Sequence, residues 1–420
     1  MTGHDTAALA IELDDQLAEA DEQLHRLYPG EAPGRQPVHT VYVPANKYSE
    51  DVVPEWGRQA RQVFEENIAD SGDLAAAFGV PAALCGTVYE RVRAKLEAEP
   101  IEDLRIDFED GYGNHPDDEE DELARSAASA LLASREEGTS APFCGIRFKS
   151  FEAPTRRRGL RTLDLFVRSL VEGGGLPSGF VVTFPKVTSV AQVEAMADVC
   201  DRIEKAYGLD AGSLRFEIQV ETPQAILGPD GTALVAPMIH SADGRCTALH
   251  YGTYDYSASC GIAAAYQSME HPAADHAKAV MQVAAAGTGV RLSDGSTNVL
   301  PVGGHDEVLA AWQLHSRLVR RSLERGYYQG WDMHPAQLPS RFAATYAFYR
   351  EGLDPAAARL RNYVHQVVSA IMDEPATARA LADFVVRGVD CGADDIAEVC
   401  ELSGCDQATL NALARREAKP

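Results

Sequence analysis

Several features common in proteins are absent from this chain of 420 residues, and each absence narrows its class. No stretch approaches the roughly 18 consecutive apolar residues of a membrane-spanning helix, so we expect no span. The first residues, MTGHDTAALAIELDD, contain no basic segment followed by an apolar run, so we expect no secretory signal. The eight cysteines include no C-x-x-C pair, which argues against a zinc ribbon. Several, such as Cys144 and Cys246, lie in apolar runs, and we expect buried thiols in a cytoplasmic protein.

Positive charge is also scarce. The chain has 38 Lys and Arg against 63 Asp and Glu, which gives a formal net charge of −25. A surface of that sign repels polyphosphates, so nucleic acid is disfavoured as a partner, although a local basic patch can still hold a phosphate group. No G-x-G-x-x-G motif follows the first apolar run, which argues against a doubly wound dinucleotide-binding fold. The apolar fraction of 45% is ordinary for a protein with a sizeable core.

What the chain does contain is a repeated alternation of short apolar runs and helical patterns. Each run ends in polar residues, and there are eight: VHTVYVPAN (38–46), LRIDFED (104–110), FCGIRFKS (143–150), FVVTFPK (180–186), RFEIQVET (215–222), CTALHYGTYD (246–255), TGVRLSDG (288–295) and YYQGWDMHP (327–335). Continuous apolar strands that alternate with helices are typical of a parallel sheet covered on both faces. Eight such units predict an α/β fold, a (β/α)₈ TIM barrel spanning residues 37–345.

Helical patterns flank the predicted barrel on both sides. Residues 5–28 place Leu and Ile at helical spacing among acids, which predicts an amphipathic N-terminal helix within residues 1–36. Residues 346–420 contain helical patterns only, which predicts a helical C-terminal extension. Because the apolar faces of such an extension must be covered, we expect it to pack on the barrel or on another subunit of a homo-oligomer.

In a TIM barrel, polar residues at the C-terminal ends of the strands project into one shared mouth. The candidates at the ends of the eight runs are mostly acids: Asn46, Lys47, Asp107, Glu109, Asp110, Arg147, Lys186, Glu221, Asp255, Asp294 and His334. Carboxylates without clustered Cys or His suit Mg²⁺ or Mn²⁺ better than Zn²⁺. Each residue alone has a structural explanation, since Glu221 can cap an amide and Asp255 can cap a helix. The recurrence of such residues at every strand end favours a functional site.

The ordered motifs of the chain resemble those of a known superfamily. VPAN, DFED, a third strand ending in Arg, FPKV, a fifth strand ending in ET, GTYD and GWDMHPAQ follow one another over residues 38–345. This order is similar to that of the HpcH/HpaI aldolase and citrate lyase β-subunit superfamily, and in particular of its citrate lyase β-subunit, malyl-CoA lyase and citramalyl-CoA lyase branch. The resemblance implies a TIM barrel, a trimeric or hexameric assembly and a small-molecule substrate.

The resemblance also implies roles for individual residues. Glu221 and Asp255 match the two carboxylates that hold Mg²⁺, and Arg147 matches the arginine that binds the carbonyl or enolate oxygen of the substrate. The positions that line the site correspond to Asp107, Glu109, Asp110 and Lys186, and the architectural motif near the eighth strand corresponds to His334 and Gln337. The implied activity is a Mg²⁺-dependent carbon–carbon lyase or aldolase, acting on a 3-hydroxyacyl-CoA or a related β-hydroxy or oxo acid through a metal-stabilised enolate.

Other functions remain open at this stage. A pyruvate-type class II aldolase carries His where this chain has Asp110, which favours the lyase branch. A thioesterase acting on a malyl-type thioester, or a non-catalytic subunit, would use the same scaffold. The general base stays undecided among Asp107, Glu109 and a carboxylate from a neighbouring subunit, for which the C-terminal candidates are Asp390, Asp394 and Asp395.

Two departures from the family pattern bear on the substrate. The third strand continues as IRFKS, and segments 111–140 and 151–178 are expected to be insertions. The segment TRRRGLR (155–161) has two interpretations, an anchor for CoA phosphates or a solvated face that pairs with the acidic run DDEEDE (117–122). Charge blocks are usually solvated faces, so we favour the second interpretation.

Overall fold

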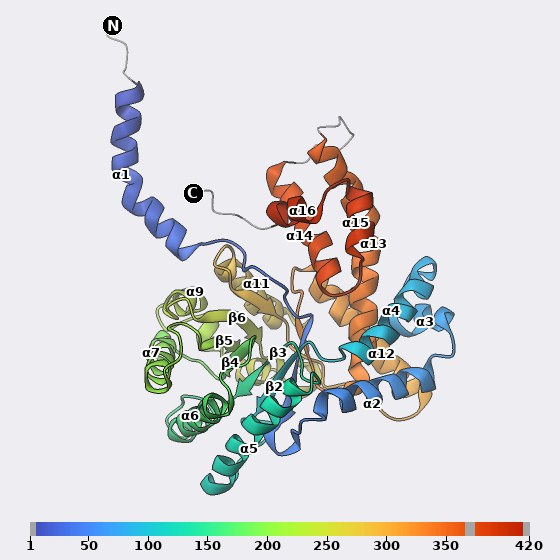
Figure 1. Cartoon of the computed structure of the whole chain (residues 1–420), viewed down its shortest axis with the longest axis horizontal. Coiled ribbons are helices and arrows are strands. Elements are labelled where there is room, and N and C mark those ends of the chain that lie inside the picture. Colours follow the sequence, from blue (N-terminus) through green and yellow to red (C-terminus); the bar gives the residue numbers. More distant parts are fainter. Residues whose placement is uncertain (1–5, 366–373, 415–420) are drawn as a thin grey trace.

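The computed structural model describes residues 6–365 and 374–414, and the predicted barrel is confirmed (Figure 1). All pairings between neighbouring strands are parallel, in the order β7-β6-β5-β4-β3-β2-β1-β8. The eight strands coincide with the eight predicted runs: β1 (His39–Pro44), β2 (Asp103–Asp107), β3 (Phe143–Arg147), β4 (Phe180–Phe184), β5 (Arg215–Val220), β6 (Cys246–Tyr251), β7 (Arg291–Ser293) and β8 (Gly330–Asp332).

The barrel closes through short segments at its seam. His39 of β1 lies in register with Gly330 of β8, so the first and last strands pair directly. Between β7 and β8 the contact is a single bridge from Ser293 to Gln329, extended by the Asp294 amide, which donates to the Gln329 carbonyl at 2.8 Å.

Along each strand, successive side chains face alternately the surrounding helices and the barrel interior. In β2, Leu104 and Ile106 belong to the core between sheet and helices, whereas Asp103, Arg105 and Asp107 are polar and almost fully buried. Since successive residues of a strand point to opposite faces, the polar set faces the barrel interior. Sequence analysis expected continuous apolar strands, and this expectation is wrong for the inner face.

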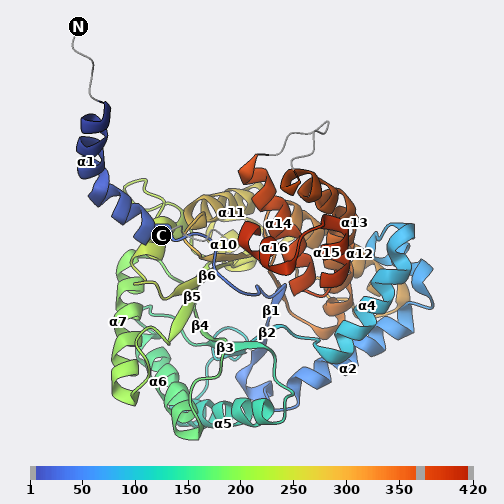
Figure 2. The same ribbon diagram turned by 45° about the horizontal axis from the view of Figure 1, so that its top comes forward.

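Helices surround the barrel on its outer side (Figure 2). Those between β1 and β5 are α2 (Val52–Asn67), α3 (Leu74–Phe78), α4 (Cys85–Ala98), α5 (Asp117–Glu136), α6 (Arg156–Gly173) and α7 (Val190–Tyr207). Those between β5 and β8 are α8 (Pro223–Ile226), α9 (Val235–His240), α10 (Thr253–Ser259), α11 (Pro272–Ala285) and α12 (His305–Glu324). The segments 111–140 and 151–178, which were expected to be insertions, contain α5 and α6, the helices that connect β2 to β3 and β3 to β4.

The basic and acidic segments on these two helices pair with each other. Arg158 Nη2 lies 2.5 Å from Asp121 Oδ1, and Arg161 Nε lies 2.8 Å from the same carboxylate. The interpretation of TRRRGLR as a face that pairs with the acidic run is confirmed for these residues.

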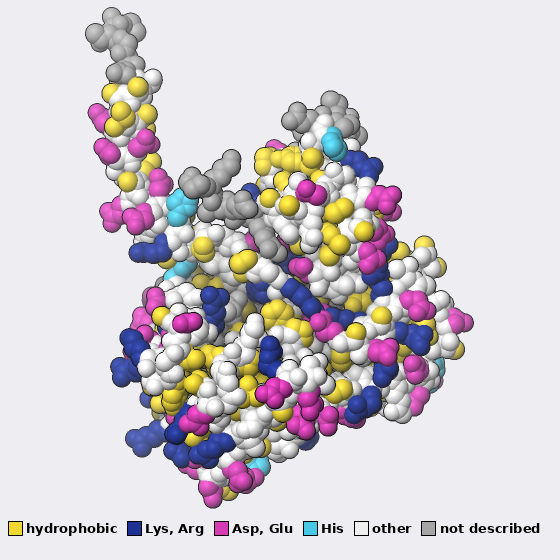
Figure 3. All heavy atoms as spheres, in the orientation of Figure 1, with side chains coloured by type: hydrophobic (Ala, Val, Ile, Leu, Met, Phe, Trp, Pro, Cys, Tyr) yellow, Lys and Arg dark blue, Asp and Glu magenta, His cyan; other side chains and the backbone are white. Residues whose placement is uncertain are grey.

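The predicted N-terminal helix is α1 (Thr6–Leu27), and it projects from the barrel as Figure 3 shows. None of its residues is buried, and Ile11 and Leu24 are more than half exposed. Its acidic and apolar side chains are both open to solvent.

The C-terminal helices form a separate layer beside the barrel. α13 (Leu338–Val364) runs through residue 345, where sequence analysis places a domain boundary, and packs with α14 (Pro375–Asp390), α15 (Ile396–Ser403) and α16 (Gln407–Ala414) around a second core. Arg387 of α14 donates to Gln36 Oε1 at 2.7 Å, just before β1. The extension therefore contacts the N-terminal end of the barrel.

Two further expectations can be compared with the structure. Among the residues that are described, no helix combines the length and apolar character that crossing a bilayer requires. All eight cysteines lie in the described ranges and are free thiols, and six of them, including Cys144 and Cys246, are buried.

Candidate functional site

A buried ion pair connects the second and third strands at the C-terminal mouth. Arg147 Nε and Nη2 each donate to Asp107, at 2.7 Å to Oδ1 and 2.7 Å to Oδ2. The same carboxylate accepts the amides of Glu109 (3.0 Å) and Gly111 (2.9 Å). A Cβ on Gly111 would lie 2.5 Å from Asp107 Oδ2, so the turn needs glycine there. With four donors in place, Asp107 orients the arginine.

Aromatic rings support the same guanidinium from below. Arg147 Cζ lies 4.8 Å from the ring centre of Tyr42 and 5.7 Å from that of Trp331. Burial opposes the charged form, but Asp107 and then Glu109 outweigh burial, and the pKa of Arg147 is raised well above its usual value. Its Nη1 lies 3.4 Å from Gln219 Oε1 and 3.5 Å from Glu109 Oε2, so this nitrogen is the most weakly engaged and is directed toward the neighbouring acids.

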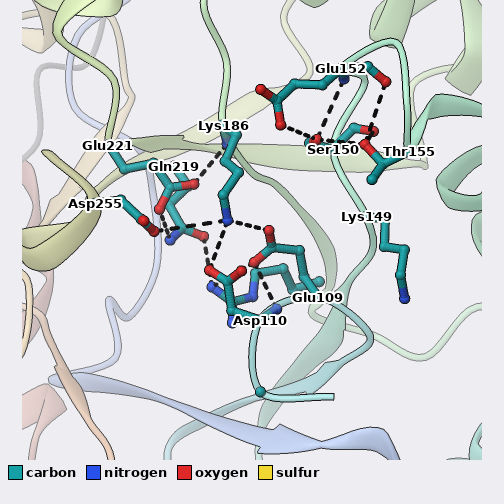
Figure 4. Close-up of polar contacts among 12 residues, drawn as sticks. Glu109, Asp110, Lys149, Ser150, Glu152, Thr155, Lys186, Gln219, Glu221 and Asp255 are labelled. Carbon is teal, nitrogen blue, oxygen red and sulfur yellow. Dashed lines mark hydrogen bonds and ion pairs between the residues drawn. The ribbon is translucent and has the colours of Figure 1, made fainter. Parts of the chain in front are cut away.

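Lys186 lies among several acids, as Figure 4 shows. Its ammonium donates to Glu109 Oε1 and to Asp110 Oδ2 (2.7 Å), and lies 3.8 Å from Asp255 Oδ2. Lys186 has a φ of 53°, a left-handed conformation that is strained for a residue with a Cβ and is frequent at functional sites. Burial lowers its pKa, but the nearby acids Glu221, Glu109 and Asp110 raise the pKa by more than burial lowers it. The ammonium therefore stays protonated.

Glu221 is 1% exposed and follows β5 directly. Its Oε1 accepts the Lys186 amide at 2.7 Å, and its Oε2 accepts Gln219 Nε2 at 2.6 Å. Burial raises its pKa well above the usual value; Lys186 opposes that shift, and the like charges of Asp255 and Glu109 add to it. A Cβ on Gly252 would lie 2.5 Å from Glu221 Cβ, so the loop after β6 must be glycine to leave room for the carboxylate.

The structure thus brings together the seven residues that the sequence predicts for catalysis and metal binding: Asp107, Glu109, Asp110, Arg147, Lys186, Glu221 and Asp255. Asp107 is paired with Arg147, and the other four carboxylates lie around Lys186. Glu109, Asp110 and Asp255 form ion pairs with its ammonium, and Glu221 accepts its backbone amide. Asp255, with a side chain 49% exposed, forms the open edge of this acidic cluster, and Glu221 forms its buried floor.

This donor set fits a hard divalent cation. Each Glu221 oxygen accepts one hydrogen bond and keeps another lone pair, and Asp255 is largely free to turn toward it. A second cation would relieve the excess negative charge around Lys186. No group of three or more His, Cys, Asp or Glu arranged to hold a metal is found in the described residues, so these two carboxylates would leave the remaining positions to water or substrate.

Several other strand-end candidates point elsewhere. Asp294 is buried and binds Lys278 at 2.9 Å and Ser322 at 2.6 Å, away from the acidic cluster. His334 Nδ1 accepts the Ala336 amide at 3.1 Å, as its expected architectural role requires.

The side chains of Gln337 and Lys149 also make structural contacts outside the acidic cluster. Gln337 Oε1 accepts the Met333 amide at 2.8 Å. Lys149 of the unusual IRFKS segment forms a buried pair with Glu120 at 2.8 Å and points away from the cluster in Figure 4. Asn46 and Lys47 are exposed, with no contact that ties them to the cluster.

The C-terminal acids considered as donated bases are engaged in their own subunit. Asp394 Oδ1 lies 3.1 Å from Arg350, and Asp395 lies 2.5 Å from Arg91 of α4. Asp390 borders a small pocket beside Gln36, at the N-terminal end of the barrel. Within this chain, none of these three acids contacts the acidic cluster in the described structure.

Sequence reasoning missed the residues that position the catalytic candidates. Gln219 bridges Arg147 and Glu221, and Tyr42 and Trp331 lie beneath the guanidinium. A signal existed for Gln219, because it precedes Glu221 by two residues and must therefore share its inward face.

A second polar cluster at the end of β8 is closed. Asp332 accepts Arg341 through Nε (3.1 Å) and Nη2 (2.8 Å), and contacts His39 Nδ1 at 2.7 Å and His315 Nε2 at 3.2 Å. Ser340 Oγ lies 2.8 Å from His315 Nδ1, which completes a Ser-His-Asp order. Both Ser340 and Asp332 are 0% exposed, so no substrate reaches this Asp332 cluster, and its role is structural.

Comparison with known proteins gives a family and a fold. The family model described as "Domain of unknown function (DUF6986)" matches residues 17–418, and no curated protein sequence matches the chain. A citrate lyase from Burkholderia xenovorans LB400 is 19% identical with a TM-score of 0.59, over 90% of this chain and 99% of that one.

Two other solved structures are more distant. CitE from Mycobacterium tuberculosis, in complex with magnesium, acetoacetate and coenzyme A, is 15% identical with a TM-score of 0.48, over 86% of this chain and 99% of that one. Malate synthase from Haloferax volcanii is 15% identical with a TM-score of 0.48, over 91% and 99%.

The Burkholderia xenovorans protein bears the name citrate lyase, as does the branch that the ordered motifs resemble, so its structure confirms the expected resemblance at the level of the fold. Sequence identity is too low to transfer an activity from it. The family model, by contrast, begins within α1 and ends beyond α16, and the chain belongs to the family described as "Domain of unknown function (DUF6986)".

Proposed function

We propose that this chain is a Mg²⁺-dependent carbon–carbon lyase or aldolase that cleaves or forms a 3-hydroxyacyl-CoA or a related β-hydroxy or oxo acid. The observation that carries the proposal is the acidic cluster beside a fixed arginine, at the mouth where TIM-barrel enzymes place their chemistry. Three of its carboxylates form ion pairs with the Lys186 ammonium, and the fourth, Glu221, accepts the Lys186 backbone amide. The fold shared with a protein named citrate lyase supports the same reaction class.

Glu221 and Asp255 would hold the metal. When bound, Mg²⁺ supplies Lewis acidity and a template for the hydroxyl and carboxylate oxygens of the substrate. Gln219 and the Lys186 amide fix the Glu221 carboxylate, so the donor on the barrel side is preorganised. Mn²⁺ has the same ligand preferences and would substitute for it.

Arg147 would stabilise the enolate. Cleavage of a carbon–carbon bond beside a carbonyl leaves negative charge on oxygen, and a preorganised cation lowers the barrier where that charge develops. Asp107 and the two aromatic rings hold the guanidinium before substrate arrives, and Nη1 is the nitrogen left for the substrate oxygen.

Glu109 is the base that the contacts favour for the hydroxyl proton. Burial raises its pKa, Arg147 lowers it and Asp110 raises it again, and the net shift is upward, which makes the carboxylate a better proton acceptor. Asp107 is less suitable because both of its oxygens are bound to Arg147. Lys186 remains an ammonium, so it would orient Glu109 and Asp110 rather than accept the proton.

The first experiment measures metal binding directly by calorimetry with Mn²⁺ and Mg²⁺. Glu221→Gln and Asp255→Asn are expected to weaken binding by about a hundredfold or more, since removing a charged ligand costs several kcal/mol. Asp198→Asn, an exposed acid on α7, is the matched control and should bind as the wild type does. Equal affinity in all four proteins would refute the metal site.

The second experiment identifies the reaction. The protein is incubated with Mg²⁺ and a panel of 3-hydroxyacyl-CoA thioesters and free β-hydroxy acids, and products are analysed for oxo acid, free CoA and free hydroxy acid. A lyase or aldolase yields an oxo acid, whereas the alternative thioesterase yields a hydroxy acid and CoA without carbon–carbon cleavage. Products from pyruvate-type substrates alone would favour the pyruvate-type class II aldolase.

The assembly and the location belong to the same proposal. The exposed apolar side chains of α1 support a homo-oligomer, for which trimer and hexamer are the expected sizes. The free cysteines support a reducing compartment, the cytoplasm. Sedimentation of the purified protein would give the number of subunits.

A further inference from the structure

A cavity of about 420 Å³ opens at the N-terminal end of the barrel, opposite the acidic cluster. Its lining includes the first or second residue of each of the six strands β2 to β7. Beside β1 and β8 it includes Pro37 and Gln329, which precede those strands. Small side chains such as those of Gly179 and Ala248 leave this space unfilled. Because this end of a TIM barrel is normally packed with side chains, an open volume in the size range of small-ligand pockets needs an explanation.

The charged groups at this opening are mostly arginines. At the floor, Arg105 binds both acids of the lining, Glu217 at 2.7 Å and Asp103. At the rim, Arg291 is fixed by donating to the carbonyls of Pro33 and Gly34. The cavity lining therefore carries an excess of positive charge in a strongly acidic chain.

Arg215 is the arginine best placed to bind a ligand. It is the first residue of β5, it is exposed, and no hydrogen bond or ion pair of its guanidinium is found in the described parts of the chain. Ser178 and Ser213 line the same rim and are exposed, so two hydroxyl donors accompany it.

The floor holds a further polar group without a full set of partners. His250 is 5% exposed, and its Nε2 has no hydrogen-bond partner in the described structure, although Glu217 Oε2 lies 3.2 Å away. Its Nδ1 lies 3.5 Å from the Tyr42 hydroxyl, and the Tyr42 ring lies under Arg147. The cavity floor and the mouth thus belong to one column of packed side chains.

We propose that this cavity is a second binding site, which takes a small oxyanion bearing a carboxylate or a phosphate group. Arg215 would pair with the anionic group through its planar guanidinium, which suits both groups, while Ser178 and Ser213 donate to remaining oxygens. The site is independent of the proposed catalytic function, because the two lie at opposite ends of the barrel and attract charges of opposite sign.

The test is binding of inorganic phosphate and of succinate, in separate arms, to the full-length protein at constant ionic strength. Calorimetry gives affinity, and the midpoint of thermal unfolding gives a second readout. We expect at least one of the two anions to bind saturably and to raise the midpoint. Which arm responds shows whether the site prefers phosphate or carboxylate.

Four variants make the test specific. Arg215→Ala should weaken binding about tenfold or more, and Ser178→Trp should block the opening without changing its charge. Arg202→Ala removes an exposed arginine of α7 and should bind like the wild type, and so should Glu221→Gln at the other end. The proposal fails if neither anion binds, if Arg215→Ala and Arg202→Ala have equal affinity, or if Glu221→Gln alone abolishes binding.

Discussion

Glu221 and Asp332 are carboxylates at strand ends of the same barrel, both almost completely buried, yet burial has opposite outcomes for them. Burial raises the pKa of both. At Asp332, Arg341, His315 and His39 outweigh burial and hold the pKa well below the usual value. At Glu221 the hydrogen bonds come from neutral groups. Lys186 lowers the pKa there, but it does not outweigh burial and the neighbouring acids Asp255 and Glu109, so the pKa stays well above its usual value.

The difference separates a structural carboxylate from a functional one. A buried acid with its own cations stabilises the fold and has no charge to offer a ligand. A buried acid whose neighbouring cations do not balance the surrounding acids lowers stability until another cation arrives, which is the situation of a metal ligand before binding. In this pair of buried acids, the upward pKa shift identifies the carboxylate whose charge is not fully compensated.

The largest expected effect comes from breaking the compensated cluster. Asp332→Asn leaves Arg341 buried without a counter-charge, so we expect the free energy of unfolding to fall by about 3–5 kcal/mol in urea denaturation at pH 7. The loss should shrink as pH falls below about 4, because Asp332 of the unfolded wild type then binds a proton that the folded state excludes, and this lowers the stability of the wild type. Asp255→Asn, at the exposed edge of the other cluster, is the control; a loss below about 1 kcal/mol for Asp332→Asn would contradict the comparison.

A smaller effect of opposite sign is expected at Glu221. With a chelator present, Glu221→Gln should raise the free energy of unfolding by about 1 kcal/mol at pH 8, because a raised pKa means that charging this group opposes folding. Glu221 of the folded wild type keeps a proton that the unfolded chain releases above about pH 4.5. The free energy of unfolding of the wild type therefore declines as pH rises above 4.5, and its difference from that of the variant widens. Denaturation at pH 5 and pH 8 measures the gap, and a destabilised variant at both pH values would overturn the assignment.

The packing around Glu221 gives a third way to sharpen the contrast. Gly252→Ala places a Cβ against Glu221, and we expect weaker Mn²⁺ binding with a stability loss of about 1 kcal/mol, the low end of overpacking costs. Gly86→Ala in α4, where a new Cβ meets nothing, should raise stability by up to about 1 kcal/mol and leave binding unchanged. Calorimetry measures Mn²⁺ affinity and urea denaturation measures stability for both variants. Equal affinity and equal stability in the two variants would show that Gly252 does not constrain the Glu221 carboxylate.

The smallest effect is expected where charges pair at the surface. Arg161 is more than half exposed, so Arg161→Ala should leave the midpoint of urea denaturation unchanged. Turnover of any substrate found in the product screen should also be unchanged. A marked rise in KM for CoA thioesters alone would revive the alternative in which this basic segment anchors CoA phosphates.

The sequence was most informative where local pattern determines structure. All eight strands could be predicted because each is a short apolar run followed by a polar end, and the acidic cluster could be predicted because parallel strands bring those ends together. The orientation of a side chain beyond a strand depends on its loop, which explains why Asp294 turns to Lys278 instead of the mouth.

Long-range pairing left no local signal. Nothing near Asp332 indicates that its partner is His39, 293 residues earlier. The polar interior was, by contrast, visible in principle: in DLRID the charged residues alternate with Leu104 and Ile106, a period of two that indicates one polar and one apolar face.

The bond between His39 and Asp332 also sets an order of events during synthesis. When β1 leaves the ribosome, His39 has no carboxylate partner and one edge of the strand is unpaired. Asp332 of β8, which fills both roles, is made 293 residues later. At about 5–20 residues per second, this delay is roughly 15–60 s. The first strand must therefore wait, paired only with β2, until the last strand emerges, and barrel closure becomes a late step of folding.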